Sequence, residues 1–279
     1  MIPMTTTHYA CPICSFPLQN QEKLFRCKNN HSFDRAKENY LNLLPVQFKH
    51  SKNPGDNKAM VNARRAFLEQ GYYQPLVDRL VALYQEKVLT DTDASKPTIV
   101  LDAGCGEGFY THQHENTENT VYGVDIAKEA IKKAGKKYPQ CHFSVATLSK
   151  LPFSDSLFSW IISVYAPILE KEFTRVLSAG GFLLTVTPAK QHLMQLKQHI
   201  YHDAKEHDEE KLPIEHLALV HQENISYQMH LKTGQDTLNL LAMTPFAFKA
   251  SKEAKESLLS QHDFICQADF LIRLYQKSN

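Results

Sequence analysis

The strongest constraint on the fold lies at residues 100–108. There the apolar segment Val100-Leu101-Asp102-Ala103 runs directly into the turn Gly104-Cys105-Gly106-Glu107-Gly108. Glycine adopts backbone conformations that other residues avoid, and it lets a backbone approach a ligand closely. A helix after such a turn offers unpaired N–H groups at its first residues. The segment therefore predicts a strand, a ligand-binding turn and a helix in succession. The turn alone does not identify the ligand, and its third glycine comes one residue too early for the dinucleotide-binding pattern.

Short apolar segments alternate with longer amphipathic ones after residue 98. This alternation predicts an α/β fold, a Rossmann-like parallel sheet with helices on both faces. Two later strands are expected to add to one edge as an antiparallel pair. Upstream, helical periodicity covers residues 58–88, and residues 90–97 are expected to form a polar linker. The candidate strands are Thr98–Ala103, Thr120–Asp125, His142–Ala146, Phe158–Val164, Phe182–Thr187, Ile225–Leu231 and Phe264–Tyr275, and the candidate helices are Ala127–Lys137, Glu170–Leu177 and Thr237–Ala242.

A second apolar segment ends in Asp125, about twenty residues after the glycine turn. A carboxylate at this position is suited to accept hydrogen bonds from both hydroxyls of a ribose. It is equally suited to cap the helix that follows. One aspartate can do both, so the two interpretations are compatible.

A metal site is indicated near the N-terminus, where Cys11, Cys14, Cys27 and His31 follow the pattern C-x2-C-x12-C-x3-H. Two thiolates separated by two residues can bind one ion, and four nitrogen or sulfur ligands complete the tetrahedron of a structural Zn²⁺ site. A redox pair of Cys11 and Cys14, or free thiols, is the alternative. Because residues 8–33 are short and polar, zinc is expected to supply their folding energy, whereas the sheet is expected not to need the metal.

The net charge of +1 hides an asymmetry, because the first 75 residues hold ten basic and five acidic side chains. A basic stretch is a candidate contact for a polyanion, although a solvated surface explains this modest excess equally well. No apolar run approaches the ~18 residues of a membrane span, and no signal peptide is visible. We therefore expect a cytoplasmic protein without a membrane partner. The stretch consists of Lys49, Lys52, Lys58, Arg64 and Arg65.

Three segments in order resemble the successive motifs of class I S-adenosylmethionine methyltransferases: residues 102–108, Asp125, and Leu151-Pro152-Phe153-Ser154-Asp155. The resemblance implies that the glycine turn faces the methionine part of S-adenosylmethionine and that Asp125 holds its ribose. It also implies that Ala146, Thr147 and Leu148 line the adenine. The turn residues expected at the cofactor are Asp102, Gly104, Gly106 and Glu107.

Further segments are similar to a narrower family, the bacterial 23S ribosomal RNA guanine-N1 methyltransferases. This resemblance implies methylation of N1 of a specific guanine in a hairpin loop, a zinc module that engages RNA, and a homodimer. It also places Tyr73 and His192 at the cofactor; without it, Tyr73 would be read as a core aromatic and His192 as a helix-start residue. The segments are Cys27–Gln47, Asn53–Asp56, Ala63–Leu68, Tyr72–Leu76, Tyr165–Pro167, Thr187–Pro188, His192–Leu193 and Met243–Phe246.

The resemblance divides the chain into a zinc-binding module (1–45), a basic linker with helices (46–97) and a methyltransferase domain (98–279). Its catalytic residues are not identified by sequence. Tyr165 stands where amine methyltransferases carry an Asn/Asp-Pro-Pro-aromatic motif, and it can stack on a base or simply pack at a strand end. The N1 proton could pass to Asp56, Glu107 or solvent. Two other functions stay open: a methyltransferase acting on a quinone or metabolite with zinc as a staple, and an inactive zinc-module RNA-binding protein.

Overall fold

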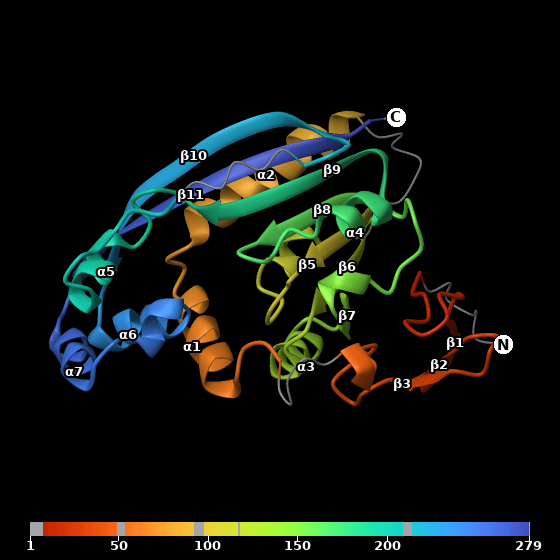
Figure 1. The fold of residues 1–279 in the computed structure, drawn as a ribbon, viewed down its shortest axis with the longest axis horizontal. Coiled ribbons are helices and arrows are strands. Elements are labelled where there is room, and N and C mark those ends of the chain that lie inside the picture. Colours follow the sequence, from red (N-terminus) through yellow and green to blue (C-terminus); the bar gives the residue numbers. More distant parts are fainter. Residues whose placement is uncertain (1–7, 49–53, 92–97, 117, 209–213, 279) are drawn as a thin grey trace.

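The computed structural model describes residues 8–48, 54–91, 98–116, 118–208 and 214–278 (Figure 1). Near the N-terminus, three short strands form an antiparallel sheet: β1 (Gln19–Gln21), β2 (Leu24–Arg26) and β3 (Ser32–Asp34). We call residues 8–34 the N-terminal module. In Figure 1 it lies at one end of the long axis, and a group of three helices lies at the other end. These helices are α5 (Met194–Ile200), α6 (Gly234–Ala242) and α7 (Lys252–Ser260).

The centre of the molecule is an eight-stranded sheet in the order β10-β11-β9-β8-β5-β6-β7-β4. Neighbours from β4 to β9 run parallel, whereas β11 is antiparallel to both β9 and β10. This arrangement confirms the predicted Rossmann-like sheet and its antiparallel addition at one edge. The strands are β4 (Tyr40–Asn42), β5 (Ile99–Ala103), β6 (Thr120–Asp125), β7 (His142–Val145), β8 (Phe158–Val164), β9 (Leu177–Pro188), β10 (Leu217–Leu231) and β11 (Phe264–Lys277).

The helical periodicity of residues 58–88 belongs to two helices. Gly71 lies between them with φ of +79°, a conformation that favours glycine and ends the first helix. The side chain of Asn57 caps the start of the first helix by accepting from the N–H groups of Ala59 and Met60. The remaining helices are α1 (Lys58–Glu69), α2 (Gln74–Asp91), α3 (Lys128–Lys137) and α4 (Glu170–Val176), with short 3-10 turns η1 (Val46–Phe48), η2 (Thr111–His114), η3 (Leu148–Lys150) and η4 (Pro245–Phe248).

The two faces of the sheet are covered differently. Val100, Trp160 and Ile162 point into a cluster that contains residues of α1, α2 and α3. Leu101 and Ile161 point to the other face, where α4 and the N-terminal module cover the strands. The N-terminal module therefore covers part of this face of the sheet, as helices cover the other parts of the sheet. No helix in the described ranges is long and apolar enough to cross a membrane.

The N-terminal module is joined to the sheet and is not a separate appendage. The ring of Tyr9 stacks on that of Phe153 with centroids 5.2 Å apart, and the N–H of Ala10 donates to the carbonyl of Pro152 at 2.8 Å. Farther along, β4 pairs in parallel with β7, and its residues Tyr40 and Leu41 are buried. Residues 40–42 thus belong to the main sheet, although the sequence grouped them with the module.

Candidate functional site

A cavity of about 660 Å³ opens at the carboxyl ends of β5, β6 and β8. In a parallel sheet this is where ligands bind. Nearly all the residues predicted at the cofactor line it, together with both catalytic candidates. The predicted residues on its wall are Asp56, Tyr73, Gly104, Gly106, Glu107, Asp125, Thr147, Leu148, Tyr165 and His192.

The glycine turn approaches its surroundings closely. Gly104 and Gly106 have φ of +84° and +54°, in the region that other residues rarely adopt. A Cβ on Gly104 would lie only 2.3 Å from the Cβ of Ala166, so position 104 leaves no space for a side chain. The backbone of the turn therefore forms the floor of the cavity directly, as a close-fitting ligand requires.

Asp125 links the turn to the next helix. Its Oδ2 accepts from the N–H of Gly106 at 2.9 Å, and its Oδ1 accepts from the N–H of Ala127 at 2.7 Å. Burial raises the pKa of Asp125, and the two backbone hydrogen bonds oppose that rise. Each oxygen keeps a second lone-pair direction for a ligand, so capping and ribose binding are compatible, as the sequence indicated.

Glu107 is the most unusual group on the wall. It is 2% exposed, and neither carboxylate oxygen has a hydrogen-bond partner in the described part of the chain. Burial raises its pKa to about 7, although Arg65, whose Nε lies 3.7 Å from Oε2, opposes the rise. A buried carboxylate without a hydrogen bond is costly, and a cationic or hydrogen-bonding ligand in the cavity would relieve that cost.

Asp102 lies beneath the turn and does not line the cavity. It is 1% exposed, and its Oδ2 accepts from the hydroxyl of Thr111 at 2.6 Å. Burial raises its pKa to about 7. The structure therefore gives Asp102 a role in supporting the turn, and its predicted contact with a cofactor has no support in this geometry.

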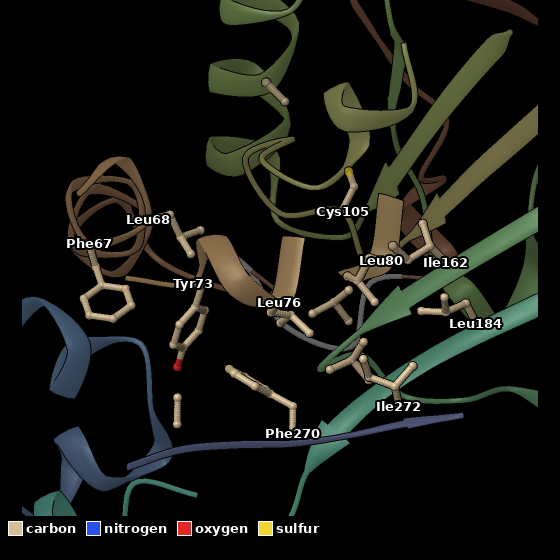
Figure 2. Packing of buried hydrophobic residues seen from close by; sticks show 14 of the residues in the cluster. Phe67, Leu68, Tyr73, Leu76, Leu80, Cys105, Ile162, Leu184, Phe270 and Ile272 are labelled. Atoms are coloured by element: carbon tan, nitrogen blue, oxygen red, sulfur yellow. The ribbon is translucent and has the colours of Figure 1, made fainter. Parts of the chain in front are cut away.

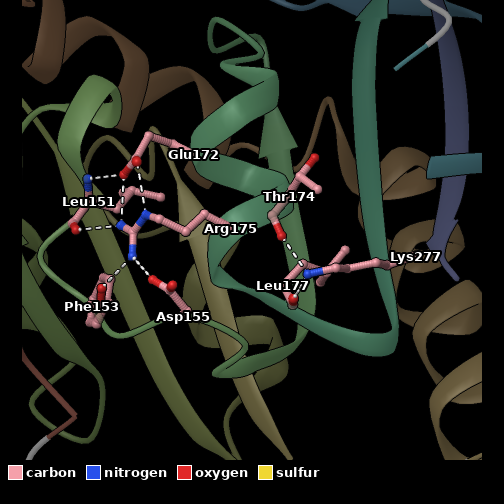
Figure 3. A network of polar contacts seen from close by, with 8 residues as sticks. All are labelled: Leu151, Phe153, Asp155, Glu172, Thr174, Arg175, Leu177 and Lys277. Carbon is pink, nitrogen blue, oxygen red and sulfur yellow. Dashed lines mark hydrogen bonds and ion pairs between the residues drawn. The ribbon is translucent and has the colours of Figure 1, made fainter. Parts of the chain in front are cut away.

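Thr147 and Leu148 begin the loop that carries the Leu151-Pro152-Phe153 motif, and this loop is clamped to α4 (Figure 3). Arg175 donates to the carbonyls of Phe153 and Leu151 at 2.8 and 3.0 Å, and it pairs with Glu172 at 2.8 Å. The guanidinium group presents several N–H donors in a rigid plane, which suits such a clamp. Arg175 thereby fixes the loop that carries Thr147 and Leu148 to the cavity wall.

Tyr73 and His192 meet at Phe270, a fully buried residue of β11. The ring centroids of Tyr73 and Phe270 are 5.0 Å apart, and those of His192 and Phe270 are 4.9 Å apart. Figure 2 shows Tyr73 facing Phe270 among aliphatic side chains. Tyr73 is 4% exposed, so it is a core aromatic that also reaches the cavity wall.

Asp56, one of the two catalytic candidates from the sequence, forms an ion pair with Arg64 at the cavity wall. Arg65 pairs with Glu69 and lies near Glu107. The two arginines of the basic stretch thus neutralise carboxylates of this chain, which weakens the prediction that they contact a polyanion. Lys58 is exposed at the start of α1, and Lys49 and Lys52 lie outside the described residues.

Several wall residues were not predicted as site residues from the sequence. Tyr110 comes just after the glycine turn, where the structure has the short 3-10 turn η2 in place of the predicted helix, and His207 lies in a segment without a recognisable pattern. The segment Met243–Phe246 carried the family resemblance, but no chemistry marked it as part of a site. Tertiary structure brings all of these to the cavity from elements far apart in the chain.

The four predicted metal ligands come together in the N-terminal module, with all ligand atoms within 4.8 Å of one another. The Sγ atoms of Cys14 and Cys27 are 3.6 Å apart, and each lies 3.4 Å from Nδ1 of His31. Zn–S and Zn–N bonds of roughly 2.3 and 2.0 Å in a tetrahedron put ligand atoms about 3.5–3.8 Å apart, so the cluster fits zinc. Four protein ligands leave no open position, which makes the zinc structural.

Comparison with known proteins agrees with both parts of the structure. Residues 9–52 match the family model described as "RlmA, N-terminal", a zinc ribbon, and residues 100–181 match a methyltransferase domain. The 23S rRNA (guanine(748)-N(1))-methyltransferase of Streptomyces fradiae is 34% identical over 67% of this chain and 65% of its own length, just under two thirds. A Micromonospora griseorubida protein, provisionally named a 23S rRNA (guanine-N(1)-)-methyltransferase, is 32% identical over 70% of each chain. This chain belongs to that family.

A third member of the 23S rRNA (guanine-N1) methyltransferase family, YxjB of Bacillus subtilis, is also provisionally named. It is 26% identical over 95% of this chain and 96% of its own length, so the similarity extends to the residues beyond the two domain models. The methyltransferase domain takes S-adenosylmethionine as its cofactor, and the Cys3His cluster holds zinc.

Proposed function

We propose that this protein methylates N1 of a specific guanine in a hairpin loop of 23S ribosomal RNA, using S-adenosylmethionine. The observation that carries the proposal is a cavity with an open glycine turn, Asp125 and Glu107, in a chain that also holds the zinc ribbon of this family. S-adenosylmethionine supplies a methyl group bound to a positively charged sulfur.

Different cavity residues bind the ribose, the adenine and the methionine part of the cofactor. Asp125 holds the ribose with the lone pairs that Gly106 and Ala127 leave free. Thr147 and Leu148 face the adenine from the clamped loop. The methionine end lies at the glycine turn. Glu107 offers it a negative charge, and Tyr73, with His192, closes this end. These contacts are complementary in charge to a cationic cofactor.

The substrate must be presented in an open form. N1 of guanine lies in the Watson–Crick edge, where a paired strand covers it, so the base must be unpaired or flipped. A hairpin loop provides this at little cost. The basic segment of the first 75 residues is the proposed RNA surface, since phosphate contacts come mainly from lysine and arginine. We further propose that the enzyme acts in the cytoplasm as a homodimer.

Methylation of defined RNAs tests the proposal. Ribosomal RNA hairpins from a strain lacking the enzyme should acquire 1-methylguanine in the loop, identified by mass spectrometry of the nucleosides. A matched duplex of the same sequence should acquire little. Equal activity on both, or methylation of a quinone or metabolite instead of RNA, would refute the proposed substrate. Cofactor binding without methyl transfer to any of these would point to an inactive RNA-binding protein.

A further inference from the structure

Two non-glycine residues on the cavity wall, Leu193 and Tyr165, have a positive φ, and of the two only Tyr165 exposes its side chain. Tyr165 directly follows β8, and its φ of +56° lies in the left-handed region, which a tyrosine rarely adopts. Such a conformation costs of order 1–3 kcal/mol, and residues that hold it cluster at active sites, although several turns elsewhere in this chain hold it as well. Tyr165 remains 45% exposed although it lines the cavity. Its side chain is therefore presented to a ligand at a cost in stability.

A hydrogen-bond chain determines which atoms of this wall carry hydrogen. The backbone N–H of Asp269 donates to Nδ1 of His192 at 3.1 Å, so Nδ1 must be unprotonated. Burial, with His207 nearby, lowers the pKa of His192 to about 3, and the ring is neutral at pH 7. The single ring proton is thus on Nε2.

Nε2 of His192 lies 3.0 Å from the hydroxyl oxygen of Tyr165. Because Nε2 carries the proton, it donates and the tyrosine oxygen accepts. Within the described part of the chain, His192 is the only hydrogen-bond partner of that hydroxyl. The O–H of Tyr165 is then free to donate to a ligand in the cavity, and the backbone of β11 has set this direction through His192.

We propose that Tyr165 donates this hydrogen bond to O6 of the target guanine and that His192 is its positioning residue. This inference rests on the proposed function. As the N1 proton leaves to water, negative charge spreads onto O6, and a donor already aimed at O6 stabilises it. The N1 lone pair then forms the new bond to the methyl carbon. The carbon–sulfur bond breaks with its electron pair remaining on sulfur, which becomes a neutral thioether.

The same donor selects the base. Adenine carries an amino group in place of O6, and two donors would face each other there. A site built to donate to a carbonyl rejects a ligand that lacks the acceptor, because its own hydroxyl is left unpaired. The titratable or charged groups nearest this pair are Tyr73, Tyr110, Tyr227 and Asp269 around Tyr165, and His207 and Lys197 around His192.

The test compares Tyr165→Phe with a matched control, Tyr227→Phe. Tyr227 also packs near Phe270, but its hydroxyl donates to the carbonyl of Tyr72 at 2.9 Å and it does not line the cavity. Single-turnover methylation of the hairpin RNA is measured from about pH 6 to about pH 9 with saturating cofactor. Tyr165→Phe should be roughly 100-fold slower near neutral pH, the usual loss for a donor to a developing oxyanion. The deficit should shrink as pH rises, because hydroxide then removes the N1 proton without help.

Cofactor affinity, measured by titration calorimetry, should be unchanged in Tyr165→Phe, and Tyr227→Phe should match the wild type throughout. His192→Leu should be as slow as Tyr165→Phe, whereas His192→Gln, whose amide can donate to the tyrosine oxygen, should restore most of the rate. A Tyr165→Phe enzyme at the wild-type rate, a deficit independent of pH, or a loss of cofactor affinity would overturn the inference. So would failure of His192→Gln to restore a rate that His192→Leu had lost. Failure of the proposed function is distinct, because the wild type itself would then leave the loop guanine unmodified.

Discussion

At the residue scale, Asp125 joins the glycine turn to the helix that follows and keeps lone pairs for a ligand. Asp125→Ala removes both backbone hydrogen bonds and the ribose acceptor. Hydrogen bonds to a charged group contribute roughly 1.5–3 kcal/mol, so the dissociation constant for S-adenosylmethionine should rise about 10- to 150-fold. Titration calorimetry on the folded variant measures this. Asp78→Ala, an exposed change on α2 outside the cavity, is the control. Unchanged affinity in folded Asp125→Ala would remove this residue from the site.

The raised pKa of Glu107 predicts a pH dependence of stability opposite to that of a salt-bridged carboxylate. Its pKa rises from 4.5 to about 7 in the folded protein. Between these values the folded state holds a proton that the unfolded state has lost, so stability falls as pH rises through this window. At ~1.4 kcal/mol per unit, ionised Glu107 costs up to about 3 kcal/mol above pH 7.

Glu107→Gln keeps the shape of the side chain without the charge. The variant without cofactor should therefore be more stable than the wild type by up to about 3 kcal/mol near pH 8, and the difference should vanish below about pH 4.5. Urea denaturation of both proteins at the two pH values measures it. Because Asp102 also titrates near pH 7 in both proteins, only the difference between them reports on Glu107. A difference that is the same at both pH values would contradict the assignment.

At the scale of elements, strands that are buried on both faces were the most predictable. β5 and β8 consist mostly of apolar residues, and their predicted bounds differ from the observed ones by one residue at most. By contrast, β10 begins at Leu217, eight residues before the predicted start. It is an edge strand whose residues alternate between exposed and half-buried. Its first half contains the polar residues His221, Gln222 and Glu223, which give no apolar pattern from which a strand could be predicted. Helix α5 was missed because it is short and follows Leu193, whose φ is +57°.

The candidate site shows the same limit. The positions of Gly104, Gly106 and Asp125 on the cavity wall were predictable, because a turn and the strand beside it are specified by residues close together in the sequence. The pairing of Tyr165 with His192, and of His192 with Asp269, was not. His192 and Asp269 are 77 residues apart in the sequence, and their contact depends on the antiparallel position of β11 beside β9. Sequence patterns report local geometry, whereas such contacts exist only once the sheet has assembled.

At the scale of the whole molecule, the N-terminal module and the sheet share one hydrophobic cluster. Leu18 and Phe25 of the module belong to the same cluster as Leu101, Tyr122 and Phe153. This shared cluster leads us to predict that loss of zinc destabilises the sheet as well, in place of the expectation that the sheet does not need the metal. Zinc organises one wall of a core that the sheet also uses, and that wall includes the loop beside Thr147 and Leu148.

Removal of zinc should consequently affect the whole chain. Cys27→Ala should lose the metal and disorder the N-terminal module, because zinc supplies its folding energy. Exposure of the shared cluster should lower the melting temperature of the entire protein by about 5–10 °C, since each kcal/mol shifts it by ~2–4 °C in a chain of this size. Cofactor affinity should fall modestly through the loop that Tyr9 and Ala10 contact. RNA methylation should fall much further, because the module forms part of the proposed RNA surface.

The matched control is Cys141→Ala, which removes a buried thiol of the other cluster and leaves all four zinc ligands in place. It should retain zinc and methylate RNA, even if it is somewhat less stable. Zinc content by atomic absorption, melting by circular dichroism, cofactor affinity by titration and methylation rate on the hairpin are measured for both variants. A zinc-free Cys27→Ala that melts and methylates as the wild type does would show that the module neither supports the sheet nor engages RNA. Loss of methylation with unchanged melting would show that it acts on RNA alone.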